Sequence, residues 1–352
     1  MIRVLGLALY GSLAASTRYR LEQYVTGLAR HGIELQIRHL LGDNYLRRTF
    51  NGESKPWPSL IHAGWNRLRD LHGQKQFDAL MLHCELFPLM PAWMEQYLLR
   101  KPYVYDFDDA FYLKYRNGRF SRLQPILGRK FESVMASAAR VTAGSHVLQD
   151  YAARHNPKTS FLPTVVDTSR YLPFRHKRGR ELVIGWIGSP STAPYLSLLV
   201  SPLTRLGLEG PVRFVVVGGR APVIPNITLE EVPWSEDTEV DLINRFDIGV
   251  MPLPDDAWAR GKCAFKLIQY MACGVPVVAS PIGANVEVVG KECGLLATAE
   301  LNWLEAFRTL RDQPEYAAEM GKAGRERIER DYSLDRNTPV LAEVLQSAVR
   351  PS

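Results

Sequence analysis

Two lysines precede the most distinctive stretch of this sequence. Lys262 and Lys266 are four residues apart, and on a helix that spacing places both side chains on one face. Gly274 and Pro276 then separate the helical pattern from an apolar run, so the helix is expected to end at a glycine cap and turn directly into a strand. Cations beside the backbone N–H groups of a helix N-terminus stabilise a diphosphate. We interpret both lysines as candidate phosphate ligands, with a solvated helix face as the alternative.

A short loop rich in glycine and hydroxyl groups forms a second candidate site. It follows an apolar run and contains Gly188, Ser189, Ser191 and Thr192. Hydroxyl and backbone N–H groups in such a loop can donate hydrogen bonds to an anion, although an ordinary tight turn has the same composition. Gly218 and Gly219 follow another strand, but the G-x-G-x-x-G fingerprint is absent, which disfavours a nicotinamide-dependent dehydrogenase.

Three aspartates follow the apolar run 103–105. Asp106, Asp108 and Asp109 stand where a strand is expected to end, and ligands of open parallel sheets bind beyond the carboxyl ends of the strands. We therefore assign candidate catalytic roles to all three, with Asp108 first. An acidic loop in which Asp109 caps a helix is the alternative.

Two further residues, His83 and Arg18, are assigned to the same candidate site as the aspartates. His83 ends the apolar run 79–83, although a lone histidine there is more often structural. Carboxylates bind hard cations, so a metal held by the aspartates is an alternative. Because lysines and helix N-termini can neutralise a diphosphate without a metal, we expect neither a metal nor a cofactor other than the co-substrate.

The segment 111–131 interleaves aromatic and basic side chains. Its members are Phe111, Tyr112, Lys114, Tyr115, Arg116, Arg119, Phe120, Arg122, Arg129, Lys130 and Phe131. Such a mixture suits a surface that touches anionic lipid. RNA binding uses similar residues, but no nucleic-acid motif is present. We therefore expect a lipid-linked acceptor or a membrane surface and no nucleic-acid partner.

Short apolar runs alternate with helical patterns along the chain, which predicts α/β architecture with helices covering parallel sheets. In the first half, strands are expected at 3–9, 34–39, 79–83, 103–105 and 141–143, with a helix over 17–30. In the second half, they are expected at 182–187, 213–217, 247–251 and 275–279. The candidate ligands thus stand just after predicted strands or at a predicted helix start.

The length of 352 residues predicts two domains. The proline-containing, basic stretch 171–180 indicates a linker. We expect domains at 1–170 and 181–333, with a final helix at 334–352 that returns towards the first domain. The net charge of +6 favours anionic partners. The four cysteines lack C-x-x-C spacing, which argues against zinc or a disulfide framework. No apolar run is long enough for a spanning helix, so we expect a cytoplasmic protein, with peripheral attachment to the inner face of the membrane as a further hypothesis.

The stretch Tyr270–Ser280, YMACGVPVVAS, resembles the donor-site run of the retaining GT-B glycosyltransferases of the large family four. Three more segments are similar to landmarks of that family and follow in the same order: Val141–Ser145, Leu162–Asp167 and Ile184–Gly188. The resemblance implies two facing Rossmann-like domains with a cleft between them. The C-terminal domain would bind the nucleotide sugar and the N-terminal domain the acceptor, which would put His83 and Arg18 on the acceptor side.

This chain departs from the family pattern in its donor site. Relatives usually carry two glutamates eight residues apart, where this chain has Gly261 and Gln269. Gln269 can still hydrogen-bond a ribose or sugar hydroxyl, but neither position supplies a carboxylate. Many relatives also carry an Arg and a Lys where this chain has the loop 188–192, and members often place a sugar-facing histidine where it has Asp108.

The resemblance implies transfer of a hexose-type residue from a UDP or GDP sugar to a glycan or lipid-linked acceptor, with retention of configuration, as in polysaccharide and cell-envelope biosynthesis. In that mechanism the donor phosphate accepts the acceptor proton, and cations and dipoles stabilise the leaving diphosphate. The missing glutamates favour one alternative, a non-catalytic sugar-nucleotide-binding protein of the same fold.

Overall fold

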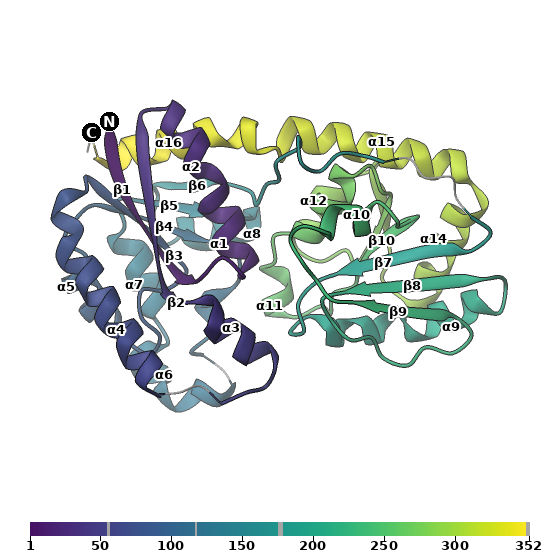
Figure 1. Ribbon diagram of the computed structural model, residues 1–352, viewed down its shortest axis with the longest axis horizontal. Coiled ribbons are helices and arrows are strands. Elements are labelled where there is room, and N and C mark those ends of the chain that lie inside the picture. Colours follow the sequence, from purple (N-terminus) through teal and green to yellow (C-terminus); the bar gives the residue numbers. More distant parts are fainter. Residues whose placement is uncertain (55–56, 117, 175–178, 350–352) are drawn as a thin grey trace. The chain divides into compact units, whose positions relative to one another are not determined.

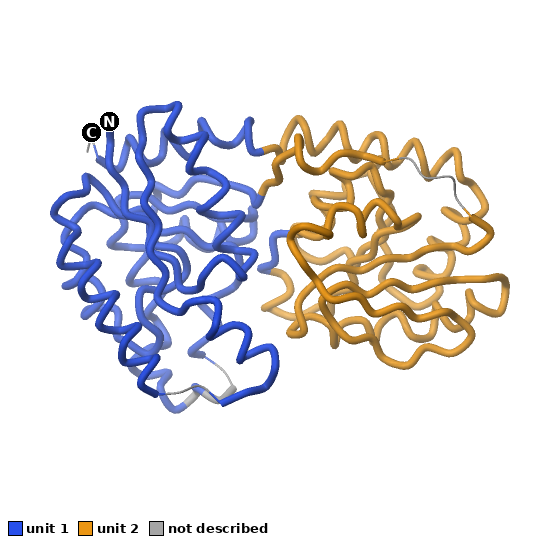
Figure 2. The backbone as a smooth tube through the Cα atoms, viewed as in Figure 1, with its two compact units in different colours: residues 1–164, 261–263, 334–352 blue, residues 165–260, 264–333 orange. Residues whose placement is uncertain are grey.

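The computed structural model describes residues 1–54, 57–116, 118–174 and 179–349 (Figure 1). The chain divides into two compact units, coloured separately in Figure 2. Unit 1 comprises Met1–Thr164, Gly261–Cys263 and Leu334–Ser352, and unit 2 comprises Val165–Arg260 and Ala264–Ser333. Each unit has its own six-stranded sheet, so the predicted α/β architecture with two parallel sheets is confirmed.

The sheet of unit 1 has the strand order β2-β1-β3-β4-β5-β6, and every pairing is parallel. Its strands are β1 (Ile2–Tyr10), β2 (Ile33–Leu41), β3 (Ala79–His83), β4 (Tyr103–Phe107), β5 (Arg140–Ala143) and β6 (Thr159–Phe161). All five residues of β3 and of β4 are buried. Because strands buried on both faces read as continuous apolar runs, the sequence located them well.

Helices connect these strands and cover the sheet. They are α1 (Ala15–Arg20), η1 (Glu22–Tyr24), α2 (Val25–Arg30), α3 (Asp43–Phe50), α4 (Trp57–His72), η2 (Gly73–Gln76), α5 (Ala92–Leu98), η3 (Phe111–Leu113), η4 (Gly118–Leu123), α6 (Gln124–Leu127), α7 (Lys130–Ser137) and α8 (His146–Ala153). The C-terminal α16 (Leu334–Val349) packs on α2 and on β3, β4 and β5 of this unit.

The single helix predicted over 17–30 is wrong, because three short helices occupy that region. Leu21 leaves the helical conformation, with φ −128° and ψ −62°. Leu21 and Tyr24 are fully buried there. The break ends α1 at Arg20, whose side chain enters the interior of unit 1.

The sheet of unit 2 has the order β12-β11-β10-β7-β8-β9, again entirely parallel. Its strands are β7 (Leu182–Ile187), β8 (Val212–Val217), β9 (Thr228–Val232), β10 (Ile248–Met251), β11 (Val277–Ala279) and β12 (Gly294–Leu296). Its helices are η5 (Ala193–Leu199), α9 (Val200–Gly207), α10 (Glu239–Ile243), α11 (Ala257–Arg260), α12 (Phe265–Ala272), α13 (Ala284–Val289), α14 (Glu300–Asp312) and α15 (Pro314–Asp331).

The turn from α12 into β11 is built as the sequence predicts. Gly274 has φ +69°, the left-handed conformation that a glycine cap adopts. Its N–H donates to the Met271 carbonyl at 2.9 Å, and the Val275 N–H donates to the Tyr270 carbonyl at 3.0 Å. These bonds satisfy the last carbonyls of the helix, so the chain enters β11 without a connecting loop.

The contact-defined units differ from the expected domain limits in two places. Unit 2 begins at Val165 rather than after the linker, and Tyr171, at the start of the expected linker, is 1% exposed within it. The short segment Gly261–Cys263 belongs to unit 1 although unit 2 surrounds it in the sequence. Residues 175–178 of the expected linker lie outside the described residues. The segment 334–349 folds as a helix on unit 1.

Candidate functional site

A buried ion pair lies at the carboxyl ends of the strands of unit 1. Asp106, on β4, and Arg20, at the end of α1, both have fully buried side chains. The guanidinium contacts both carboxylate oxygens, with Nε 3.1 Å from Oδ2, and also donates to the Leu162 carbonyl at 2.6 Å. Although burial acts in the opposite direction, Arg20 and His83 hold the pKa of the Asp106 carboxyl well below its ordinary value.

The other bonds of Asp106 orient two neighbouring strands. His83, on β3, places Nδ1 2.8 Å from Asp106 Oδ2, and Thr142, on β5, donates from Oγ1 to Oδ1 at 2.6 Å. Asp106 thus accepts bonds from three directions and is held as a fixed charge. Three aspartates were assigned catalytic roles. The Asp106 carboxylate is buried and holds Arg20, His83 and Thr142 in place, which corrects its assignment as a catalytic carboxylate.

His83 and Cys84 form a turn at the end of β3. Since Nδ1 of His83 faces Asp106, Nε2 points the other way and lies 3.0 Å from Cys84 Sγ and 3.9 Å from Asp108 Oδ1. Cys84 has φ +65°, which is uncommon for a residue with a side chain. His83 itself is 1% exposed, so it supports Asp106 and Asp108 from behind.

Asp108 and Asp109 are the more accessible carboxylates, with side chains 16% and 25% exposed. The Asp108 carbonyl accepts from Cys263 Sγ at 2.9 Å. Asp109 pairs with Lys262 at 3.3 Å and accepts from the Ala110 N–H at 3.0 Å. Burial raises the pKa of Asp109 in spite of Lys262. The assignment of Asp108 as the first candidate catalytic carboxylate stays a prediction.

Among the described residues, the three aspartates do not form a metal site, because the Arg20 guanidinium binds the carboxylate of Asp106. Their one group of three with ligand spacing is His83, Cys84 and Asp108, whose ligand atoms lie within 4.8 Å of one another. Asp106 Oδ2 lies 2.8 Å from His83 Nδ1, the position that a carboxylate takes behind a metal-bound histidine. The expectation that no metal is required stays a prediction.

Lys262 does not lie on the helix that carries Lys266, so the prediction that the two share a helix face is wrong. Ala264 has φ 54°, a left-handed conformation that interrupts the helix, and α12 begins only at Phe265. Lys262 is instead in unit 1 beside Asp109. Gly261 packs against Ala110: a Cβ at position 261 would lie 2.6 Å from the Cβ of Ala110. A glutamate does not fit there, which accounts for one departure from the family pattern.

Arg18, assigned to the acceptor side, is 8% exposed and packs within unit 1. Its Nη1 donates to the Ser12 carbonyl at 2.5 Å, and its guanidinium carbon lies 5.5 Å from the centre of the Tyr19 ring. Most of the side chain is therefore committed to the fold of the loop after β1.

The aromatic and basic segment 111–131 is largely packed inward, which corrects its interpretation as a lipid-facing surface. Lys130 is buried between Glu85, at 2.7 Å, and Glu95, at 2.9 Å. Lys114 also binds Glu85, and Tyr115 and Phe131 are 1% and 2% exposed. The side chain of Arg119 lies outside the described residues. Anionic groups of unit 1 thus neutralise cations that the prediction assigned to lipid.

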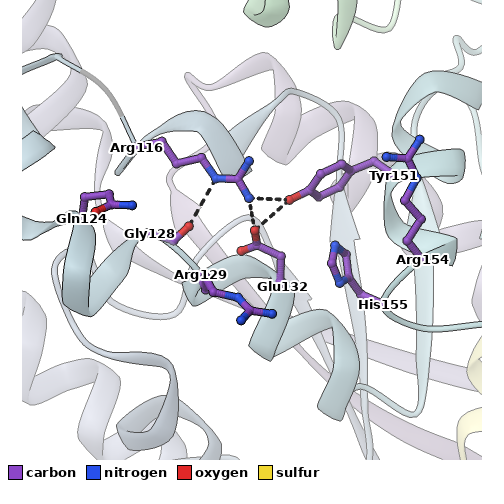
Figure 3. A pocket seen from close by; sticks show the side chains of 8 residues that line it. All are labelled: Arg116, Gln124, Gly128, Arg129, Glu132, Tyr151, Arg154 and His155. Carbon is purple, nitrogen blue, oxygen red and sulfur yellow. Dashed lines mark hydrogen bonds and ion pairs between the residues drawn. The ribbon is translucent and has the colours of Figure 1, made fainter.

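Part of this segment lines a pocket of about 550 Å³ in unit 1. In Figure 3, Arg116 points toward Glu132 and Tyr151, and bonds both of them. The pocket is completed by Gln124, Gly128, Arg129, Arg154 and His155. Its lining is more basic than acidic, but one of its cations, Arg116, is already paired with Glu132 and Tyr151.

In unit 2, Lys266 lies at the carboxyl end of β7. Its ammonium is 5.6 Å from the centre of the Trp186 ring, and its Cε would be 2.7 Å from a Cβ at Gly188. The same Cβ would lie 2.4 Å from the Trp186 ring. Only glycine therefore lets the strand end, the indole and the lysine come together. Lys266 is the second residue of α12, where backbone N–H groups add to its positive field.

The loop after β7 forms a turn with hydroxyl groups on its surface. The Thr192 N–H and Oγ1 both reach the Ser189 carbonyl, at 3.0 and 3.1 Å. The hydroxyls of Ser189 and Ser191 are 2.8 Å apart. A Cβ at Gly218 would be 2.4 Å from the Gly188 carbonyl oxygen, so the glycines after β7 and β8 meet at one edge of the sheet.

Gln269 is 4% exposed and faces the interior. Its Nε2 donates to the Tyr171 hydroxyl at 2.9 Å and lies 3.5 Å from Glu239 Oε2. Tyr171 and Trp234 also donate to Glu239, at 2.6 and 2.9 Å. The amide nitrogen is thus engaged inside unit 2, which corrects the expectation that it meets a donor hydroxyl.

Several residues of this arrangement were missed in the sequence. Arg20 and Cys84 lie in no motif, and Thr142 lies in the landmark Val141–Ser145, which does not mark it as a partner of Asp106. Arg20 is recognisable as a buried residue only once α1 is known to end there, close to the carboxyl end of β4. Glu239, the first residue of α10, had no neighbour in the sequence to mark it as the carboxylate that Gln269 contacts.

Comparison with protein families identifies unit 2. Residues 181–313 match the family described as glycosyl transferases group 1. No curated protein matches the chain in sequence.

Solved structures share the fold over the whole chain. Anabaena HepE in complex with UDP-glucose is 14% identical with a TM-score of 0.75, covering 99% of this chain and 100% of its own. Sucrose-phosphate synthase from Thermosynechococcus elongatus is 14% identical with a TM-score of 0.71, covering 100% of both chains. A glycosyltransferase from Rickettsia africae is 14% identical with a TM-score of 0.69, covering 100% of this chain and 99% of its own. Residues 181–313 therefore match glycosyl transferases group 1, and the whole chain shares the GT-B fold of these solved structures.

Proposed function

We propose that the protein transfers a hexose-type sugar from a nucleoside diphosphate sugar, UDP-linked or GDP-linked, to a glycan or lipid-linked acceptor with retention of configuration. The observation that carries the proposal is the environment of Lys266. Its ammonium stands beside Gly188 and Trp186, at the N-terminal turn of α12 and the carboxyl end of β7. Cation, helix N-terminus and glycine-rich loop together are suited to a diphosphate.

The comparisons support a nucleotide-sugar donor. HepE was solved in complex with UDP-glucose and with UDP and glucose, and its fold covers the whole of this chain. UDP-sugars are accordingly the first donors to test, with GDP-sugars as the alternative.

The chain's own residues divide the work of transfer. Lys266, the hydroxyls of Ser189, Ser191 and Thr192, and the N–H groups of α12 stabilise the charge that develops on the leaving diphosphate. Asp108 orients a hydroxyl of the sugar or the acceptor, and His83 and the fixed charge of Asp106 hold it in place. The donor phosphate takes the acceptor proton, so no protein nucleophile is required. Positioning and electrostatics then supply the rate.

A thermal-shift panel of nucleoside diphosphate sugars tests the donor. A ligand at 100 times its dissociation constant stabilises the protein by about 2.7 kcal/mol, a shift that is readily measured. Donors that stabilise the protein are then assayed for transfer and hydrolysis with labelled sugar. Binding without turnover on any acceptor would favour the alternative, a non-catalytic sugar-nucleotide-binding protein. The absence of stabilisation by every nucleotide sugar would contradict the donor site itself.

A further inference from the structure

Helix α4 of unit 1 carries a stripe of large apolar side chains on its outer surface. Trp57, Ile61, Trp65 and Leu68 are 77%, 61%, 67% and 40% exposed. Their spacings of four, four and three residues place them on one face of a helix. We call these four residues the α4 stripe.

The stripe is separate from the face by which α4 packs on its unit. Arg67 and Leu71 are 1% and 4% exposed, and Leu60 and Ala63 pack against a cluster that includes Leu9. The helix therefore has two neighbouring apolar faces. One packs against unit 1, and the other is exposed to solvent. Side chains this large are rarely exposed in a row without a partner.

One cation, Arg69, borders the stripe, and this favours an anionic partner. Arg69 and His62 are exposed and adjoin Trp65 at i+4 and i−3, so they border the stripe. The acidic residue of α4, Asp70, lies on another side of the helix, where its carboxylate is 3.7 Å from Arg38. No carboxylate of α4 thus borders the stripe.

The residue types and dimensions favour a lipid surface over a second protein chain. Tryptophan combines an apolar ring with an N–H donor and concentrates at the boundary between acyl chains and headgroups. The 16 residues of α4 span about 24 Å at 1.5 Å per residue, and the stripe is one side chain wide. A stable protein interface uses about 20–30 residues on each side.

We propose that the α4 stripe docks on an anionic membrane surface, with α4 lying in the plane of the bilayer and Trp57 and Trp65 inserted at headgroup level. None of the helices in the described part of the chain is long and apolar enough to cross a bilayer, so the attachment is peripheral and reversible. This site replaces the segment 111–131, in which Lys114, Tyr115 and Lys130 are engaged within unit 1. It does not depend on the identity of the donor.

Vesicle sedimentation of the full chain tests the proposal. The wild type is expected to sediment with vesicles of phosphatidylglycerol and phosphatidylcholine, less with phosphatidylcholine alone, and less as salt rises. Trp57→Ser with Trp65→Ser should weaken binding at least about tenfold. The matched control, Leu301→Ser with Tyr316→Ser, removes exposed side chains from α14 and α15 of unit 2 (55% and 39% exposed) and should bind as the wild type does. Nucleotide affinity should be unchanged in both variants, which separates this test from that of the proposed function.

A second measurement reports insertion directly. Lipids brominated in the upper acyl chain should quench the tryptophan fluorescence of the wild type. Trp57→Phe with Trp65→Phe keeps the apolar stripe, so it should still bind but lose most of that quenching. The proposal is overturned if the wild type ignores anionic vesicles, if the serine variant binds them normally, or if that variant abolishes only a self-association seen by analytical ultracentrifugation.

Discussion

The carboxyl edges of the two sheets have the same architecture and opposite chemistry. In unit 1 the edge is built from buried charges, with Asp106 held by Arg20 and His83. In unit 2 it is built from glycines, hydroxyls and Lys266, with Gly188 and Gly218 directly after β7 and β8. Buried charges fix geometry, whereas glycines let a ligand approach the backbone. The difference fits the proposal made above, in which unit 1 positions the reacting hydroxyls and unit 2 receives the phosphates.

The largest expected effect tests whether Asp106 is structural. Asp106→Asn leaves the Arg20 guanidinium buried without its counter-charge, which should lower the free energy of unfolding by about 3–5 kcal/mol. Urea unfolding measures the change. Asp78→Asn is a matched control, since Asp78 is an exposed aspartate that accepts from the Arg3 N–H, and it should cost less than about 1 kcal/mol. Equal costs in the two variants would show that the buried pair is not what holds this edge.

Asp108 provides the converse test, because it should matter for turnover and little for folding. Asp108→Asn keeps size and shape and is expected to lower turnover by roughly 10²–10³ while nucleotide affinity stays nearly constant. Transfer is measured with the donor and acceptor found by the panel. If Asp109→Asn shows the loss and Asp108→Asn does not, the functional carboxylate is the one beside Lys262. Near-normal transfer by both variants would leave unit 1 with a structural acidic loop.

The two lysines lie in different units, so substituting each of them tests one unit at a time. Lys266→Ala should weaken binding of the donor and of free nucleoside diphosphate by about 1.5–3 kcal/mol, the cost of losing a charge-assisted contact. Lys262→Ala serves as the comparison, since that ammonium pairs with Asp109 in unit 1, and its effect on nucleotide affinity should be smaller. Calorimetry with UDP measures both. A larger loss for Lys262→Ala would reverse the assignment.

The parts of this comparison that the sequence predicted are those with a local cause. The apolar runs of β3, β7 and β8, and the glycine turn at Gly274, follow from burial and backbone conformation within a few residues. The break at Leu21 and the left-handed Ala264 depend on tertiary packing. Spacing alone therefore predicted one helix over 17–30 and two lysines on a shared face.

The site was harder to predict than the fold, because its contacts join residues far apart in the chain. Asp106 meets Arg20 across 86 positions, and Lys262 meets Asp109 across 153. The pattern of Lys114, Tyr115 and Lys130 was interpreted as surface, since cations usually are exposed. Their partners, Glu85 and Glu95, are recognisable only from the packing of α5 and α7. The exposed α4 stripe went unnoticed because its apolar spacing resembles that of an ordinary core-facing helix.

The smallest expected effect concerns the second buried network of unit 1 and its response to pH. Burial raises the pKa of Glu95 to about 7, although Lys130 acts to lower it. Between the ordinary value of 4.5 and about 7, the unfolded chain gives up this proton and the folded chain keeps it, so this group's contribution to stability falls as pH rises. Below that window Glu95 is protonated in both the folded and the unfolded chain. Above it Glu95 is ionised in both, and the full cost of burying its charge lowers the free energy of unfolding.

Glu95→Gln isolates this contribution, because glutamine resembles the protonated acid at every pH. Relative to the wild type, the variant should become more stable by about 1–2 kcal/mol between pH 5 and pH 8, as measured by urea unfolding at each pH. The exposed Glu315→Gln on α15 is the control in unit 2 and should show no such trend. If the difference between Glu95→Gln and the wild type is the same at both pH values, Glu95 is ionised throughout. Lys130 would then outweigh burial, and the charges of this network would be as firmly fixed as that of Asp106.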